Sequence, residues 1–76
     1  MKELVSYIAK SLVDHPDDVK TAQTDVDDTV TVELTVAQDD LGKIIGKQGR
    51  TARAIRSILA AAAGRESKRS RLDILE

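Results

Sequence analysis

Residues 44–55 read IIGKQGRTARAI, and this stretch decides how the elements around it can be arranged. Gly46 and Gly49 enclose two polar residues, Lys47 and Gln48, and a helical pattern lies on each side of them. Glycine tolerates a positive φ and lets another backbone approach without meeting a Cβ. The second helix begins directly after Gly49, so its free N–H groups and positive dipole end lie at the turn. The stretch therefore predicts a tight turn between two helices that can hold a phosphate.

The chain before this stretch predicts a helix followed by a β-hairpin. Apolar residues recur at helical spacing over residues 2–13, and the Asp-His-Pro sequence at 14–16 ends that pattern. A weak strand is expected over 19–25 with a turn at 27–28, and residues 29–37 form the clearest strand. Alternation in that strand turns four aliphatic side chains to one face. They are Val30, Val32, Leu34 and Val36.

The chain around and after the glycines predicts two helices and a closing strand. The Asp39-Asp40 pair offers an N-cap for a short helix over 41–45. A long helix is expected over 50–63, with Gly64 as its C-terminal cap. Residues 70–75 alternate as a strand, with Leu72 and Ile74 facing inward. The inward-facing side chains expected on the long helix are Ile55, Ile58, Leu59 and Ala62.

The expected order is helix, strand, strand, short helix, long helix, strand. Because each element offers a single apolar face, the helices must pack on one face of a three-stranded mixed sheet, giving an α+β fold. A chain of 76 residues buries only about 60% of the surface that it exposes when unfolded. We therefore expect one domain over 1–76 with one small core, and no large enclosed active-site cavity.

The net charge of −1 conceals two halves of opposite sign. Residues 1–41 hold three Lys and Arg against ten Asp and Glu, a net charge of −7. Residues 42–76 hold nine against three, a net charge of +6. Five of the bases fall within 42–58, where there is no acid: Lys43, Lys47, Arg50, Arg53 and Arg56. This run predicts a face for polyanions, although a solvated basic helix face is the alternative.

Other glycine-rich and nucleic-acid-binding motifs do not fit. A nucleotide-binding P-loop has four residues between its glycines and a Ser or Thr after its Lys, whereas Gly42 and Gly46 enclose three and Gln48 follows Lys47. The dinucleotide-binding G-x-G-x-x-G spacing is missing. RNA-binding platforms that stack bases on aromatic side chains are also disfavoured, because Tyr7 is the only aromatic residue.

The stretch 44–55 resembles the signature of KH domains, whose GXXG loop clamps single-stranded nucleic acid. The order of elements resembles the type II KH topology, and the likeness covers the whole chain. A single KH domain of this size is similar to the small bacterial RNA-binding proteins of the KhpA type. Ala52 departs from the pattern, since many KH domains carry a larger aliphatic residue there.

The resemblance implies the following RNA-binding residues: Lys43, Ile44, Ile45, Gly46, Lys47, Gln48, Gly49, Arg50 and Arg53. The glycines and the two residues between them would contact the nucleic-acid backbone. Ile44, Ile45 and Ile55 would underlie a groove that holds about four nucleotides. The strand over 29–37 would form the opposite wall.

The resemblance also implies partners and a cellular role. The partners would be single-stranded RNA and either a second copy of the chain or a second KH-containing protein of the KhpB type. The role would be that of a cytoplasmic RNA chaperone or post-transcriptional regulator linked to cell elongation, cell shape and cell wall organisation. A module that only dimerises and leaves the GXXG loop idle is the alternative.

The sequence does not predict an enzyme, a cofactor or a metal site. Cysteine is absent, which excludes a disulfide framework and a thiolate zinc site. His15 is the only histidine, and the acidic pairs at 17–18, 27–28 and 39–40 lie at expected turns or caps, where Asp is common. No signal peptide is expected, because the N-terminus opens into an amphipathic pattern without an uninterrupted apolar stretch. No membrane span is expected, because no window approaches about 18 consecutive apolar residues.

Overall fold

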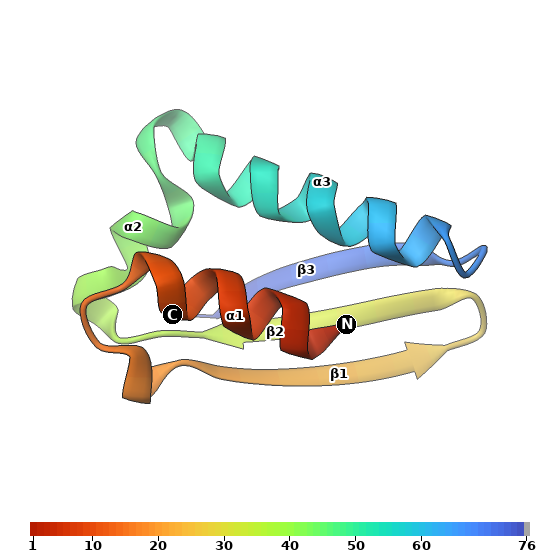
Figure 1. The fold of residues 1–76 in the computed structure, drawn as a ribbon, viewed down its shortest axis with the longest axis horizontal. Helices are drawn as coiled ribbons and strands as arrows, with labels where there is room; N and C mark the ends of the chain where they lie inside the picture. Colours follow the sequence, from red (N-terminus) through yellow and green to blue (C-terminus); the bar gives the residue numbers. More distant parts are fainter. Residues whose placement is uncertain (76) are drawn as a thin grey trace.

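The computed structural model describes residues 1–75 and follows the expected order of elements (Figure 1). The helices and strands are α1 (Lys2–Leu12), β1 (Lys20–Val26), β2 (Thr29–Thr35), α2 (Leu41–Ile45), α3 (Arg50–Gly64) and β3 (Arg69–Leu75). Three single 3₁₀ turns join them: η1 (Pro16–Asp18), η2 (Gln38–Asp40) and η3 (Lys47–Gly49). Within the described residues, no helix has both the length and the apolar character needed to cross a membrane.

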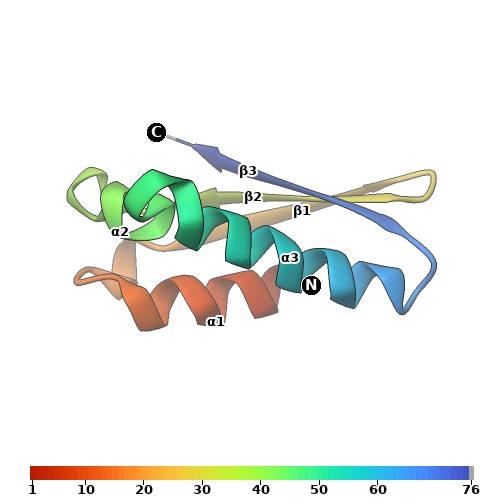
Figure 2. The ribbon, with the colours of Figure 1, turned by 90° about the horizontal axis from the view of Figure 1, so that it is seen from above.

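The three strands form one mixed sheet in the order β1-β2-β3. β1 pairs with β2 in antiparallel fashion through the turn at Asp27-Asp28, where Asp27 has a φ of 53°. β2 and β3 are parallel, because α2 and α3 carry the chain back before β3 begins. The helices lie on one face of the sheet, and the other face is uncovered (Figure 2). The predicted α+β architecture is confirmed.

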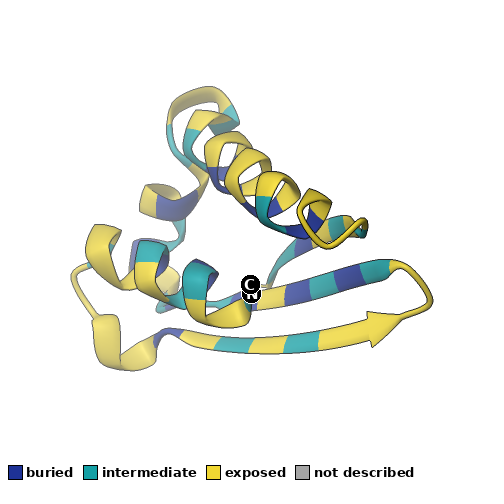
Figure 3. Cartoon of the chain, turned by 45° about the vertical axis from the view of Figure 1, so that its right-hand side comes forward, coloured by how far each residue is buried: buried dark blue, intermediate teal, exposed yellow. Residues whose placement is uncertain are grey.

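The core lies between the central strand and the helices. The alternate side chains of β2 face inward, as predicted, and appear as buried bands along that strand in Figure 3. Val32 and Leu34 are wholly buried, and they cluster with Val5 of α1, Ile44 of α2 and Leu59 of α3. β1 is mostly exposed, so the core depends on β2 far more than on the hairpin strand beside it.

The predicted inner face of α3 is partly wrong. Ile58 is 45% exposed and Ala62 is only partly buried. The stripe that packs on the sheet consists of Ala52, Ile55, Leu59 and Ala63. These residues are three or four positions apart, so they share one side of the helix. Ile58 lies one residue before Leu59, which rotates its side chain by about 100° out of that stripe.

The predicted C-terminal cap at Gly64 is also wrong. α3 includes Gly64, and Arg65 after it still has helical backbone angles. The left-handed residue lies further on, at Ser67, with a φ of 59°. The Lys68 backbone N–H then donates to the carbonyl oxygen of Ala63 at 3.0 Å, which closes the end of the helix. The chain therefore reverses its direction, from α3 to β3, in the turn that follows Gly64.

Candidate nucleic-acid interface

The turn between α2 and α3 has an unusual backbone. Gly46, Gln48 and Gly49 have φ values of 75°, 58° and 74°. The Gly46 N–H donates to the carbonyl oxygen of Gly42 at 2.8 Å and so ends α2, and the Gly49 N–H donates to the carbonyl oxygen of Gly46 at 3.1 Å. Two of the three left-handed positions are glycine, which adopts such angles without strain. The predicted tight turn between two helices is confirmed.

Gly46 is required for a second reason, which is space. A Cβ at this position would lie 2.2 Å from Thr51 Oγ1 and 2.9 Å from the Thr51 backbone nitrogen. The turn therefore folds back against the first turn of α3. A Cβ at Gly49 would have no atom within 4 Å, so that position depends only on its backbone angle.

The turn presents free polar groups to solvent. Lys47 and Gln48 are exposed, and neither side chain makes a hydrogen bond or ion pair with any of residues 1–75. α3 runs for 15 residues from Arg50, and no side chain caps its N-terminus. The Arg50 N–H donates to the carbonyl oxygen of Lys47, and the N–H groups that follow it in the first turn have no side-chain acceptor. A lysine beside a free helix N-terminus is a favourable place for a phosphate.

A groove of about 270 Å³ lies beside this turn. Its walls come from α2, from the start of α3 and from the end of β3. The lining residues are Leu41, Ile45, Gly49, Ala52, Arg56 and Ile74. Apart from Arg56 these side chains are apolar or absent, so the groove can accept the faces and edges of bases without an aromatic platform.

The family of this chain follows from its sequence relatives. Residues 2–74 match the family model described as KhpA/KhpB, KH domain. The chain belongs to this family of KH domains. That membership agrees with the expectation, made from the turn and the order of elements, of a KH domain rather than an enzyme.

Three curated relatives illustrate the match, and each is named RNA-binding protein KhpA. The protein from Halalkalibacterium halodurans is 54% identical over 76 residues and covers all of both chains. That from Clostridium acetobutylicum is 49% identical over 75 residues, covering 99% of this chain and all of the relative. That from Chlamydia muridarum is 47% identical over 76 residues, covering all of this chain and 97% of the relative. No solved structure gives a significant match.

The aliphatic residues of the KH signature divide between the groove and the core. Ile45 is 39% exposed and lines the groove. Ile44 and Ile55 are buried in the core, so neither presents a surface to a ligand, and they support the groove from below. Ala52 lines the groove directly, and its small side chain leaves the floor open at this position.

The predicted opposite wall of the groove is wrong. The strand proposed for it, β2, lies in the centre of the sheet between two neighbours. β3 pairs along its outer side, from Thr29 opposite Arg69 to Thr35 opposite Leu75. The wall is therefore provided by the edge strand, through Ile74. The sequence could not show this, since it does not say on which side of β2 the last strand pairs.

The arginines of α3 divide between groove and solvent. Arg50 and Arg53 are exposed, and neither side chain pairs with another described residue. Arg56 lines the groove, although it was not among the predicted RNA-binding residues. Its position could have been found from helical spacing, since it follows Ala52 by four residues and Gly49 by seven.

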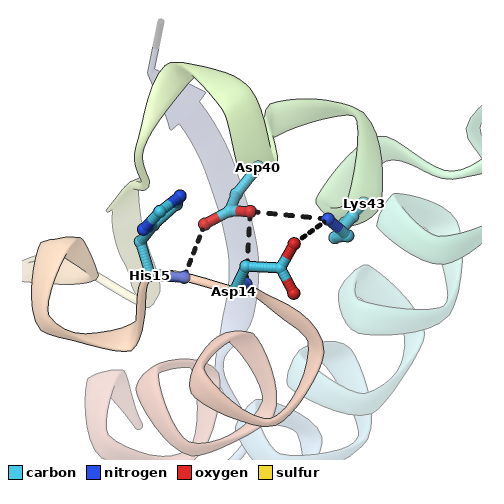
Figure 4. Close-up of polar contacts among 4 residues, drawn as sticks. All are labelled: Asp14, His15, Asp40 and Lys43. Atoms are coloured by element: carbon cyan, nitrogen blue, oxygen red, sulfur yellow. Dashed lines mark hydrogen bonds and ion pairs between the residues drawn. The ribbon is translucent and has the colours of Figure 1, made fainter.

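Lys43 does not stand free at the rim of the groove. Its Nζ lies 2.5 Å from Asp14 Oδ2 and 3.7 Å from Asp40 Oδ1 (Figure 4). The hydrogen bond with Asp14 raises the pKa of Lys43 above its usual value. Its charge is therefore engaged within the protein, unlike that of Lys47.

Asp40 was expected to cap α2, and this expectation is wrong. Its side chain makes no cap hydrogen bond and instead accepts from the backbone N–H groups of Asp14 at 3.2 Å and His15 at 2.9 Å (Figure 4). The residue is only 1% exposed. Burial opposes ionisation, but these two hydrogen bonds, with the nearby His15 and Lys43, hold the pKa of Asp40 below its usual value. Asp40 thus fastens the end of α1 to the start of α2.

The other acidic pairs of the described residues lie in turns. The pairs at 17–18 and 27–28 are exposed and lie in η1 and in the hairpin turn. Among residues 1–75, no three His, Asp or Glu side chains are grouped so that they could hold a metal ion.

Proposed function

We propose that the chain binds single-stranded RNA at the GXXG turn and the adjoining groove, which would hold about four nucleotides. The observation that carries this proposal is the turn itself, with its two left-handed glycines and a lysine that has no partner among residues 1–75, next to a helix N-terminus that no side chain caps. The name that the curated relatives carry, RNA-binding protein, supports it.

The geometry suggests how such a ligand would be held. A phosphate would accept from N–H groups in the first turn of α3 beyond that of Arg50 and lie near Lys47, with Arg50 and Arg53 contacting neighbouring phosphates. The bases would lie over Ile45 and Ile74, and Arg56 would reach the strand further along α3. Because these contacts are aliphatic, we expect modest affinity and a short site.

The decisive experiment replaces both residues between the glycines, as Lys47→Asp with Gln48→Asp. Binding of a labelled eight-nucleotide single-stranded RNA, followed by fluorescence anisotropy, should be lost at the protein concentrations at which the unmodified protein saturates the RNA, because the change puts negative charge where a phosphate would lie. The Tm should change by no more than about 2 °C, since the two side chains have no partners among the described residues. Undiminished binding would overturn the proposal.

A charge-matched control is available at the other end of α3. Arg65→Asp with Ser67→Asp alters the net charge by the same amount, and both residues are exposed. This variant should bind nearly as well as the unmodified protein. The binding constant K of the unmodified protein should also depend on salt. If about three to five phosphates are neutralised, log K should fall with log[salt] with a slope of about −2 to −3.5.

We also propose a role in the cytoplasm as an RNA chaperone or post-transcriptional regulator, with effects on cell shape and cell wall organisation. The active form would be a homodimer or a heterodimer with a KhpB-type protein. Support for a dimer comes from large apolar side chains on the surface, among them Ile58, which is 45% exposed. Light scattering tests the assembly, and crosslinking in cells followed by sequencing of the bound RNA tests the role. A dimer in which Lys47→Asp with Gln48→Asp changes nothing would favour a pure interaction module.

A further inference from the structure

A second groove lies on the other edge of the molecule, along the seam between α1 and β1. It has a volume of about 320 Å³ and is lined by Lys2, Glu3, Ser6, Tyr7, Lys10 and Thr21. Tyr7 is the only aromatic residue of the chain and is 73% exposed. Its hydroxyl has no hydrogen-bond partner among the residues that the structure describes. β1 and β3 are opposite edges of the sheet, so this seam is separate from the GXXG groove.

The seam contains two of the three bases of the acidic half of the sequence. The first 41 residues carry a net charge of −7 and contain only three bases, two of which, Lys2 and Lys10, line the seam. Its one acid is Glu3, whose Oε1 lies 3.4 Å from the N-terminal ammonium of Met1. The pKa of the Glu3 carboxyl is lowered, mostly by a hydrogen bond with the Glu3 backbone N–H and next by the hydrogen bond with the Met1 ammonium. The seam is therefore positive within an acidic half.

The groups of the seam are arranged along one edge of a fixed helix. Lys2, Ser6 and Lys10 follow at intervals of four residues, which places the two lysines about 12 Å apart along the axis. Tyr7 stands between them. The helix is held on the sheet by buried Val5 and Ala9. The Lys2 backbone N–H also donates to Gln23 Oε1 of β1 at 2.9 Å, which closes the N-terminal end of the seam.

We infer that this seam is a second contact site for single-stranded RNA, in which one base stacks on Tyr7 and the flanking phosphates meet Lys2 and Lys10. An exposed aromatic ring between two cations is the combination that holds single strands without sequence preference. The inference rests on the proposed function and extends it, since it predicts that the chain engages more RNA than the GXXG groove can hold.

Tyr7 allows a direct test, because the chain has no tryptophan and its tyrosine emission comes from this residue alone. Titration with a 12-nucleotide oligoadenylate should quench that emission, in the unmodified protein and also, at higher RNA concentration, in Lys47→Asp with Gln48→Asp. Tyr7 is then also replaced in the Lys47→Asp with Gln48→Asp variant, and the affinity for RNA is measured by anisotropy. Tyr7→Phe should retain the affinity of that variant, and Tyr7→Ser should weaken it about 5-fold or more. Lys10→Gln should make the salt slope shallower by about 0.7.

The outcomes separate this inference from the proposed function. Unchanged tyrosine emission while RNA saturates the unmodified protein would overturn the inference and leave the GXXG site standing. Quenching that persists when Lys47→Asp with Gln48→Asp has no effect on affinity would support the seam and count against the GXXG site. Emission that changes with protein concentration in the absence of RNA would show that a second copy covers Tyr7, which overturns the inference. Failure of the unmodified protein to bind RNA would overturn both.

Discussion

Lys43 and Lys47 lie four residues apart in one basic run, yet their surroundings differ completely. Lys43 bonds to Asp14 and lies close to the buried Asp40. Lys47 has no ion pair with any residue from 1 to 75. The comparison shows that the number of cations in a sequence segment does not equal the number available to a ligand. Long-range contacts decide which of them remain free.

The same contrast applies to the two ends of α2, a helix of only five residues. Its start is fixed by a buried carboxylate that binds the chain around Asp14 and His15. Its end is fixed by Gly46, whose positive φ and missing side chain let the turn fold back on Thr51. The start of α2 depends on hydrogen bonds and its end depends on backbone conformation and steric space, so mutations can damage each end separately.

The largest effect should come from Asp40→Ala. The change leaves two part-buried backbone N–H groups without their acceptor and removes one partner of Lys43. We expect the Tm to fall by about 20 °C, measured by circular dichroism. Asp39→Ala is the matched control, since its side chain is exposed, and it should change the Tm by only about 2 °C. Equal Tm values for the two variants would show that the junction contributes little.

The next largest effect should come from the glycines, taken as a series. Gly46→Ala should cost about 2–3 kcal/mol, because the φ is unfavourable and the Cβ would meet Thr51. Gly49→Ala should cost about 1 kcal/mol, since only its φ is unfavourable. Gly42→Ala, within α2 and in open space, should instead stabilise by about 0.5–1 kcal/mol. Urea denaturation would measure all three free energies, and a Gly46 variant as stable as the Gly49 variant would remove the steric argument.

Local signals explain how much of the fold the sequence predicts. The alternation of Val30, Val32, Leu34 and Val36 is a property of the segment itself, and the structure buries all four. The helical spacing in α1 is equally local. Ile58 was misplaced because its neighbour Leu59 and the four alanines that follow are apolar as well, so the pattern alone does not fix the rotation of α3 about its axis.

The candidate site was less predictable, since several of its features depend on contacts between distant residues. The turn at residues 46–49 was found from the sequence, because two glycines at that spacing indicate a tight turn with positive φ values. The partners of Asp40 lie 25 and 26 residues away, and no local pattern marks them. The wall formed by Ile74 likewise depends on which side of β2 the strand β3 pairs.

A smaller effect should distinguish the two lysines directly. Lys47→Gln should weaken RNA binding about 3- to 5-fold and reduce the magnitude of the salt slope by about 0.7, because one phosphate contact is lost. Its Tm should remain unchanged. Lys43→Gln should do the reverse, lowering the Tm by a few degrees while leaving the slope in place. If Lys43→Gln flattened the salt dependence as much as Lys47→Gln, then the pair with Asp14 would not hold this lysine away from RNA.

The smallest effect should be the pH dependence that Asp40 contributes. Its pKa in the folded protein lies below its usual value of 3.8, so the unfolded chain binds its proton more tightly. The stabilisation from the ionised carboxylate is therefore fully present above that value and is lost as the pH falls through the lower folded pKa. Asp40→Asn keeps one acceptor but removes the charge, so the stability difference from the unmodified protein should be constant from about pH 7 to 5 and shrink below about pH 4. Thermal melts of both proteins, with Asp39→Asn as control, would measure this, and a difference that stayed constant down to pH 2 would mean that hydrogen-bond geometry, and not charge, fastens the start of α2.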